Sequence, residues 1–183
     1  MDQNERKIYT ADPSALGLFG LAMITFVASS QKLGWTDGTS LLVPWAIFLG
    51  AIAQIYACVN DAKKGNVFGA TAFGAYAFFW LAVAMTWMTK NGVFGAAMAA
   101  DADMKQLGFA FLGYLIFSLY MTLASFETNK VLMIIFILID LLFLGLSLST
   151  IWGIEAGHQL AAWSELLIAL FGFYGSADRK SVV

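Results

Sequence analysis

Apolar residues occur in long runs along the chain, and short polar stretches that hold most of the charges separate them. An α-helix needs about 20 apolar residues to cross the hydrocarbon core of a bilayer. Runs of this kind predict six transmembrane helices, at Ser14–Ser30, Leu41–Asn60, Val67–Met88, Gln106–Ser125, Val131–Ile151 and Leu160–Gly175. The connections are short, so residues 1–183 are expected to form one transmembrane domain without a soluble part.

The apolar runs favour helices over the strands of a β-barrel. Barrel strands alternate apolar and polar residues with a period of two, whereas the run from Val131 to Ile139 is apolar on every side. Backbone groups inside lipid must be hydrogen-bonded within their own segment, and a helix achieves this. The predicted fold class is therefore all-α, a bundle of six transmembrane helices.

The composition agrees with a membrane protein and excludes several other classes. Of the 183 residues, 60% are hydrophobic and 12% are charged, which is about half the charged share of a soluble domain. The net charge of -2 comes with no basic stripe for nucleic acid. The lone Cys58 excludes an internal disulfide, and His158, expected in a short loop with Glu155, has no second ligand for a metal. No catalytic constellation is visible, so neither an enzyme nor a cofactor is expected.

The positive charges predict the orientation of the chain. Five Lys or Arg residues lie on the side of the termini and three lie opposite, which favours cytoplasmic termini by the positive-inside rule. The expected location is the plasma membrane, or the inner membrane of a Gram-negative cell. The five residues are Arg6, Lys7, Lys63, Lys64 and Lys130, and the three are Lys32, Lys90 and Lys105.

The end of the chain, Asp178-Arg-Lys-Ser-Val-Val183, has an unusual sequence. One reading frame of a widely used sequencing adapter encodes the same residues and then a stop codon. This agreement favours a foreign tail over residues 178–183, which would replace the native C-terminus and shorten the sixth helix. An ordinary basic tail is the alternative.

Asp12 and Pro13 stand directly before the first apolar run. Asp is a preferred helix N-cap, and Pro fits the first helical position. Their role is either purely structural or also functional, because free N–H groups and the positive end of the helix dipole would attract an anion at the membrane surface.

Three polar residues inside the predicted helices need an explanation. Asp140 lies midway along the fifth helix, where a carboxylate costs at least about 2.5 kcal/mol on insertion scales. It marks a proton or ion path, or it is protonated and donates to a neighbouring helix. Gln54, inside the second helix, needs a hydrogen-bond partner or a water-filled path. Glu165 lies near the start of the sixth helix and is expected to reach the interface.

Tyr76 and Trp80 are four residues apart in the third helix and share one face. Their hydrogen-bond donors would suit the edge of a transport path. Aromatic packing between helices explains the pair equally well.

Several segments together resemble a known family of transporters. The stretch Asp12-Pro-Ser-Ala-Leu-Gly-Leu18 is similar to the Asn-Pro-Ala-Pro-Leu-Gly-Leu signature of the acetate uptake transporter family, which includes the succinate–acetate/proton symporters. The resemblance runs from about residue 12 to the sixth helix, and its specific motifs lie in the first three helices. Further matching segments are Gly50-Ala-Ile-Ala-Gln54, Lys63-Lys-Gly-Asn-Val-Phe-Gly69, Thr71-Ala-Phe73, Tyr76 and Phe79-Trp80.

The resemblance implies a function and a set of site residues. It implies a homo-hexamer in which each protomer holds a path for acetate and related mono- or dicarboxylates such as succinate, moved together with protons. The constriction of this path is expected at Leu21, Tyr76 and Ile139. The other expected positions are Asp12, Thr25, Gln54, Asp61, Asn66 and Trp80 along the path and Asp140 for proton coupling.

Three positions depart from the family pattern. Asp12, Ala15 and Leu21 stand where the family has Asn, Pro and Phe. An acidic Asp12 would repel an anion unless it is protonated or turned inward as a cap. The smaller Leu21 would widen the path and change the range of substrates.

Two other functions stay open at this point. Acid-gated urea channels resemble this family in helix number and hexameric arrangement, so a passive channel for urea or short amides is one alternative. A membrane sensor that binds carboxylates without moving them is the other, although the short loops leave no room for a signalling domain.

Overall fold

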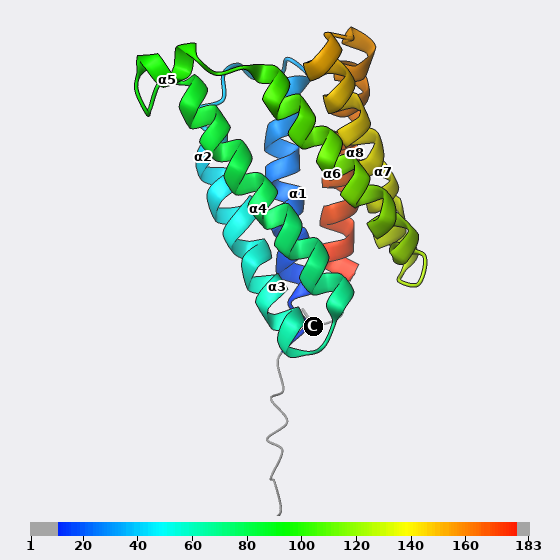
Figure 1. Ribbon diagram of the computed structural model, residues 1–183. Helices are drawn as coiled ribbons and strands as arrows, with labels where there is room; N and C mark the ends of the chain where they lie inside the picture. The colour runs from blue at the N-terminus through cyan, green and yellow to red at the C-terminus, as the bar shows by residue number, and fades with distance from the viewer. Residues whose placement is uncertain (1–10, 179–183) are drawn as a thin grey trace, which may run out of the picture.

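The structure, a computed structural model, describes residues 11–178 as a bundle of α-helices (Figure 1). Within this part, six helices are long and apolar enough to cross a membrane, which confirms the predicted all-α fold with six spans. Asp178 ends the last helix, and the rest of the predicted foreign tail, residues 179–183, lies outside the described residues. Five of the spans are single helices: α1 (Ser14–Lys32), α4 (Val67–Lys90), α6 (Met104–Ser125), α7 (Lys130–Trp152) and α8 (Glu155–Asp178).

The second span is built from three consecutive pieces, which the hydropathy pattern does not predict. It consists of α2 (Leu42–Trp45), the π-helix η1 (Ala46–Ala53) and α3 (Gln54–Lys63). The wider turns of a π-helix change the backbone hydrogen bonding, and such segments are frequent at functional sites. The Gln54 side-chain amide donates to the carbonyl oxygen of Gly50 over 2.6 Å, at the point where the π-helix ends.

The last helix begins earlier than the sequence predicts. Gly153 ends α7 in a left-handed conformation with φ of 68°, and α8 already starts at Glu155. Glycine adopts this conformation without steric cost, so the chain reverses within two residues. Glu155 and His158 were expected in a loop, and both instead lie in the first turns of α8. The short α5 (Ala96–Ala100), between α4 and α6, was also not predicted.

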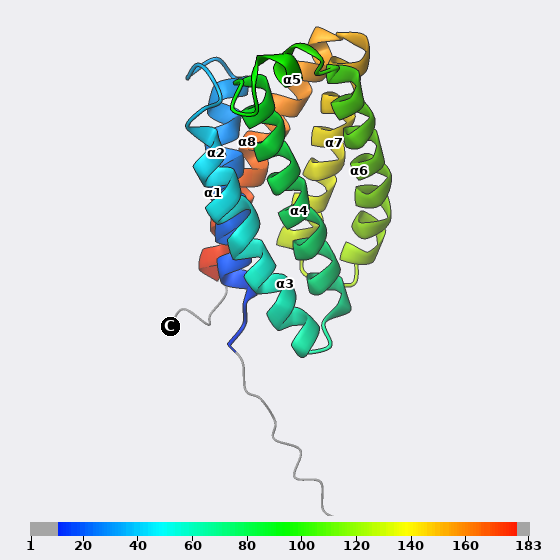
Figure 2. The same ribbon diagram turned by 60° about the vertical axis from the view of Figure 1, so that its left-hand side comes forward.

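Two views of the bundle show how its ends are arranged (Figures 1 and 2). One end holds the α3–α4 loop, the α6–α7 loop and both ends of the described chain; we call it the α3–α4 end. The other end holds α5 and the α7–α8 turn; we call it the α5 end. Since the spans are even in number, the two ends of the described chain lie on the same side.

Glycines let several of these helices approach closely. A Cβ atom on Gly50 of η1 would lie 2.8 Å from Cγ of Trp80 on α4. A Cβ atom on Gly145 of α7 would lie 2.5 Å from the carbonyl oxygen of Gly157 on α8. Small residues at such contacts are the usual way in which membrane helices pack, because lipid provides no hydrophobic force between helices.

Gly145→Ala is expected to destabilise the protein, because its Cβ would clash with the backbone of α8 rather than with a movable side chain. Overpacking of this kind costs about 1–3 kcal/mol. Gly113→Ala on α6 is the matched control, since its Cβ meets no atom within 4 Å and alanine is the better helix former. Thermal unfolding of the purified protein in detergent tests the pair. A Gly145→Ala protein as stable as the Gly113→Ala protein would contradict the packing of α7 on α8.

Candidate functional site

A cavity of about 240 Å³ opens at the α3–α4 end of the bundle. Polar residues surround its mouth and apolar residues form its inner part. It is lined by Ser14, Leu18, Leu21, Gln54, Asn66, Phe68, Gly69, Ala72, Phe73, Tyr76, Thr128, Asn129, Leu132, Ile135, Phe136 and Ile139.

The N-termini of three helices meet at this mouth. Ser14 is the first residue of α1. Asn66 caps α4 by accepting from the backbone N–H of Gly69 at 3.1 Å, and Asn129 caps α7 by accepting from the N–H of Leu132 at 3.0 Å. Each helix N-terminus carries a partial positive charge. The mouth is therefore favourable for an anion, although no Lys or Arg between residues 11 and 178 lines it.

Gln54 places a free acceptor in the same cavity. Its side chain is fully buried, and its NH₂ group donates to the Gly50 carbonyl. Its oxygen Oε1 has no hydrogen-bond partner among the described residues. A buried polar atom without a partner is costly, so this oxygen is suited to a water or a protonated ligand in the cavity.

Leu21, Tyr76 and Ile139 close the inner end of the cavity. The structure brings the three side chains together from α1, α4 and α7, and each is at most 7% exposed. They also line a second space of about 10 Å³, which is at the lower limit for holding one water molecule. The interior is therefore narrow and dry at this point. The second space is lined by Leu21, Thr25, Tyr76, Phe79, Trp80, Ile139, Leu142, Phe143 and Ile168.

Tyr76 is held by contacts on both sides. Its hydroxyl is hydrogen-bonded to the Ser118 hydroxyl of α6 at 2.8 Å. Its ring stacks on Phe143 of α7, with ring centroids 6.4 Å apart and an interplanar angle of 14°. Aromatic pairs at such distances add to the energy of burial. The position of Tyr76 is thus fixed by α6 and α7 rather than by α4 alone.

Thr25 and Trp80 lie just beyond the narrow point. The Thr25 hydroxyl donates to the Leu21 carbonyl oxygen at 2.8 Å, so it is satisfied within its own helix. Trp80 is 3% exposed and packs against Gly50, which explains why a large ring fits near the middle of α4. Trp80 also lines a third cavity, which continues toward the α5 end.

The third cavity has a volume of about 140 Å³ and lies at the α5 end. It shares Phe79 and Trp80 with the second space of about 10 Å³, so the first cavity, the second space and the third cavity follow one another through the protomer. A constricted path between the two ends of the bundle results. The third cavity is lined by Lys32, Phe79, Trp80, Val83, Thr86, Trp87, Leu107, Phe111, Leu146 and Glu165.

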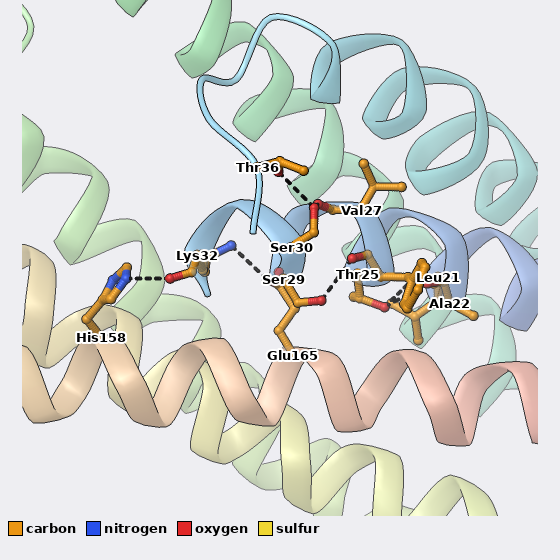
Figure 3. Close-up of polar contacts among 11 residues, drawn as sticks. Leu21, Ala22, Thr25, Val27, Ser29, Ser30, Lys32, Thr36, His158 and Glu165 are labelled. Carbon is orange, nitrogen blue, oxygen red and sulfur yellow. Dashed lines mark hydrogen bonds and ion pairs between the residues drawn. The ribbon is translucent and has the colours of Figure 1, made fainter. Parts of the chain in front are cut away.

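Lys32 and Glu165 form an ion pair inside this third cavity (Figure 3), with the Lys32 ammonium 2.8 Å from Oε2 of Glu165. The expectation that Glu165 reaches the interface is wrong. Glu165 is 1% exposed, because α8 begins at Glu155 and places this side chain well inside the bundle.

The three aspartates named from the sequence do not line the described cavities. Asp12 accepts from the backbone N–H of Ser14 at 2.9 Å and so supports the first turn of α1, which begins at Ser14 rather than Pro13. Asp61 is 2% exposed, and its carboxylate occupies the space that a Cβ on Gly69 would take.

Asp140 faces α6 instead of the path. Its Oδ2 accepts from the Thr122 hydroxyl at 2.7 Å, and it also interacts with Ser118, the partner of Tyr76. Its other oxygen, Oδ1, is buried without a partner among the described residues. Asp140 therefore contacts the constriction indirectly, through Ser118 and Tyr76.

The sequence alone does not mark Ser118, Asn129 or Lys32 as site residues. A serine inside an apolar helix and an asparagine before the next helix are too common to be singled out. Lys32 is the last residue of α1, whereas hydropathy places it in the connection after Ser30. The carboxylate of Glu165 inside a span was the one available signal for the ion pair.

Comparison with known proteins identifies related chains. The family model described as the GPR1/FUN34/yaaH family matches residues 2–180. The succinate-acetate/proton symporter SatP of Escherichia coli (strain K12) is 34% identical over 166 residues, which cover 90% of this chain and 85% of that protein. Acetate permease A of Emericella nidulans is 30% identical, covering 90% of this chain and 56% of that protein.

A solved structure, described as that of the bacterial acetate channel SatP, has the same fold. It superposes with a TM-score of 0.85 at 28% sequence identity, covering 92% of this chain and 91% of that one. The similarity therefore extends through all six spans.

The hydrogen bond between Tyr76 and Ser118 is expected to stabilise the protein measurably. Tyr76→Phe and Ser118→Ala should each lower the free energy of unfolding by about 0.5–1.5 kcal/mol. The loss of unfolding free energy in the double variant should be smaller than the sum of the two single losses, because both substitutions remove the same hydrogen bond. Chemical unfolding in mixed micelles gives the three values. Strictly additive losses would show that the two hydroxyls do not interact.

Proposed function

Since the chain belongs to the GPR1/FUN34/yaaH family, we propose that it transports acetate and related short carboxylates, succinate among them, across a membrane. The observation that supports this best is the constricted path itself. Two cavities lie on opposite sides of a dry narrow point. The narrow point shares Leu21, Tyr76 and Ile139 with the cavity at the α3–α4 end, and it shares Phe79 and Trp80 with the third cavity at the α5 end.

The mouth at the α3–α4 end would attract the acid as an anion. Three helix N-termini point their positive ends at it, through Ser14, Asn66 and Asn129. These are fixed dipoles and not full charges, so they favour an anion without holding it tightly. In this proposal Asp12 and Asp61 support the backbone around the mouth and do not bind substrate directly.

The narrow point would favour the neutral acid over its anion. An isolated charge in a dry apolar environment is far more costly than a neutral polar group. A short carboxylic acid has a pKa of roughly 4, similar to that of Asp or Glu side chains, so a protonated fraction is always available. Passage of the acid together with its proton is symport in effect. Gln54, next to the narrow point, has the free acceptor that a protonated acid requires.

Leu21, Tyr76 and Ile139 would act as the gate, and Asp140 as a positioning residue. Opening requires movement of Tyr76, which Ser118 holds by its hydroxyl. Asp140 interacts with the same serine. A change in the protonation of Asp140 would therefore reach the gate through Ser118, which is how Asp140 would take part in proton coupling.

The location, orientation and assembly of the protein are also part of the proposal. We place the protein in the plasma membrane, or the inner membrane of a Gram-negative cell, with cytoplasmic termini and in a homo-hexamer. Exposed apolar side chains on α6, such as Phe109, Ile116 and Leu123, are available to lipid or to neighbouring copies. The proposed role is transport without enzymatic chemistry.

A passive channel is the second candidate. The neutral lining of this cavity, with Asn66 and Asn129 at its mouth and Gln54 deeper inside, would also admit urea or a short amide. Flux of urea without a pH change would favour this function. Stabilisation by acetate without any flux would favour a sensor.

Purified protein in liposomes is expected to take up labelled acetate and to acidify the interior at the same time, because each acid molecule brings its proton. The rate should rise as the external pH falls. Labelled acetate and an internal pH dye measure both quantities in one experiment. Empty liposomes are the necessary control, since acetic acid crosses lipid unaided. Uptake no faster than in empty liposomes at every pH would contradict transport of acetate.

Leu21→Ala is expected to widen the narrow point and to raise the rate for succinate relative to acetate by about tenfold, the scale that a small change of volume has in a tight pocket. Leu16→Ala is the matched control on the same helix, because Leu16 is 43% exposed and does not line the path. The ratio of the two uptake rates in liposomes is the measurement. An equal ratio in both variants would exclude Leu21 from the constriction.

A further inference from the structure

The ion pair at the α5 end has no role in the path described so far. Lys32 and Glu165 both line the third cavity, with side-chain exposures of 16% and 2%. Buried ion pairs often add little net stability compared with apolar packing, because both charges must lose their hydration. Charged residues inside transmembrane segments commonly mark the route of a substrate or ion. The pair is therefore better explained by the cavity that it faces.

The position of Lys32 is fixed by two contacts from α8 (Figure 3). The imidazole of His158 is hydrogen-bonded to the backbone oxygen of Lys32 at 3.0 Å, and Glu165 holds the ammonium. An ammonium has three N–H donors. Among the described residues it forms one hydrogen bond, to Glu165. Two donors are thus left for a ligand in the cavity.

The rest of the cavity suits the apolar part of a small acid. Phe79, Trp80, Val83 and Leu146 form much of its apolar wall. The volume of about 140 Å³ corresponds to roughly five water molecules at about 30 Å³ each. A short monocarboxylate therefore fits with its carboxylate at the ammonium and its hydrocarbon part against the aromatic rings.

We propose that Lys32 binds the carboxylate of the transported acid in this cavity, and that Glu165 is the internal carboxylate which the substrate displaces. The inference rests on the proposed function and adds a binding residue on the far side of the narrow point. Without substrate, Glu165 neutralises Lys32 and keeps it oriented toward the cavity. A substrate that has lost its proton after passing the narrow point exchanges with Glu165.

Acetate uptake into liposomes by substituted proteins tests this exchange. Lys32→Met is expected to raise the KM for acetate about tenfold, the usual scale for losing a hydrogen bond to a charged group. Lys32→Arg should keep a KM near that of the wild type. Glu165→Gln should lower the KM several-fold, because the competing carboxylate is gone. Lys90→Met is the matched control: this lysine ends α4 near the α5 end, is exposed and lies outside the third cavity.

The double variant Lys32→Met/Glu165→Gln separates binding from folding. It leaves no unpaired buried charge, so it should fold and yet have the raised KM of Lys32→Met. Gel filtration checks the folding. A folded double variant with the KM of the wild type would overturn the inference, and so would a Glu165→Gln protein whose KM rises. A wild-type protein without uptake above empty liposomes would instead overturn the proposed function, and this inference with it.

Discussion

The close packing of α1 on the second span, and of the second span on α4, sets the width of the path. Gly17 allows it on the α4 side, where a Cβ atom would lie 2.5 Å from the ring of Phe73, and Gly50 allows η1 to reach Trp80. With the side chains packed this closely, Leu21 and Tyr76 leave between the two larger cavities a space of about 10 Å³, which is at the lower limit for one water molecule. A wider spacing would leave a continuous water-filled pore, through which an anion would pass with its hydration intact. The proposed selectivity for a neutral acid thus depends on helix packing as much as on the side chains of the proposed gate.

Hydropathy predicted the fold well, because backbone groups in lipid leave helices as the available answer. All six spans were found, and the errors lie at their ends and in their hydrogen bonding. The polar residues His158 and Gln159 hid the first turns of α8, since hydropathy treats a polar residue as an end even when it lies on a helix. The π-helix in the second span was invisible for another reason: π- and α-helical turns have the same composition and differ only in which carbonyl each N–H reaches.

The site was predictable in part. The constriction residues came from the family resemblance, and the structure places Leu21, Tyr76 and Ile139 side by side. Asp140 stands out in the sequence because a carboxylate inside lipid costs free energy. That cost does not tell which way the side chain points. Its partner Thr122 lies on α6 and not in the path. The pairing of Lys32 with Glu165 joins residues 133 positions apart. Such a contact depends on how α1 packs on α8, which neither residue indicates alone.

The two ends of the path solve the same problem by different means. An acid must be attracted strongly enough to enter and weakly enough to leave. At the α3–α4 end the attraction comes from helix dipoles and from the asparagines that cap the helices, none of which carries a full charge. At the α5 end a full positive charge is present, and an uncompensated ammonium in so buried a place would hold a carboxylate too long. In the proposed exchange, Glu165 offsets that charge by competing for Lys32, so the site would release its ligand instead of trapping it. The attraction for the carboxylate is thus moderate on both sides of the narrow point, and neither cavity would bind the anion too tightly to release it.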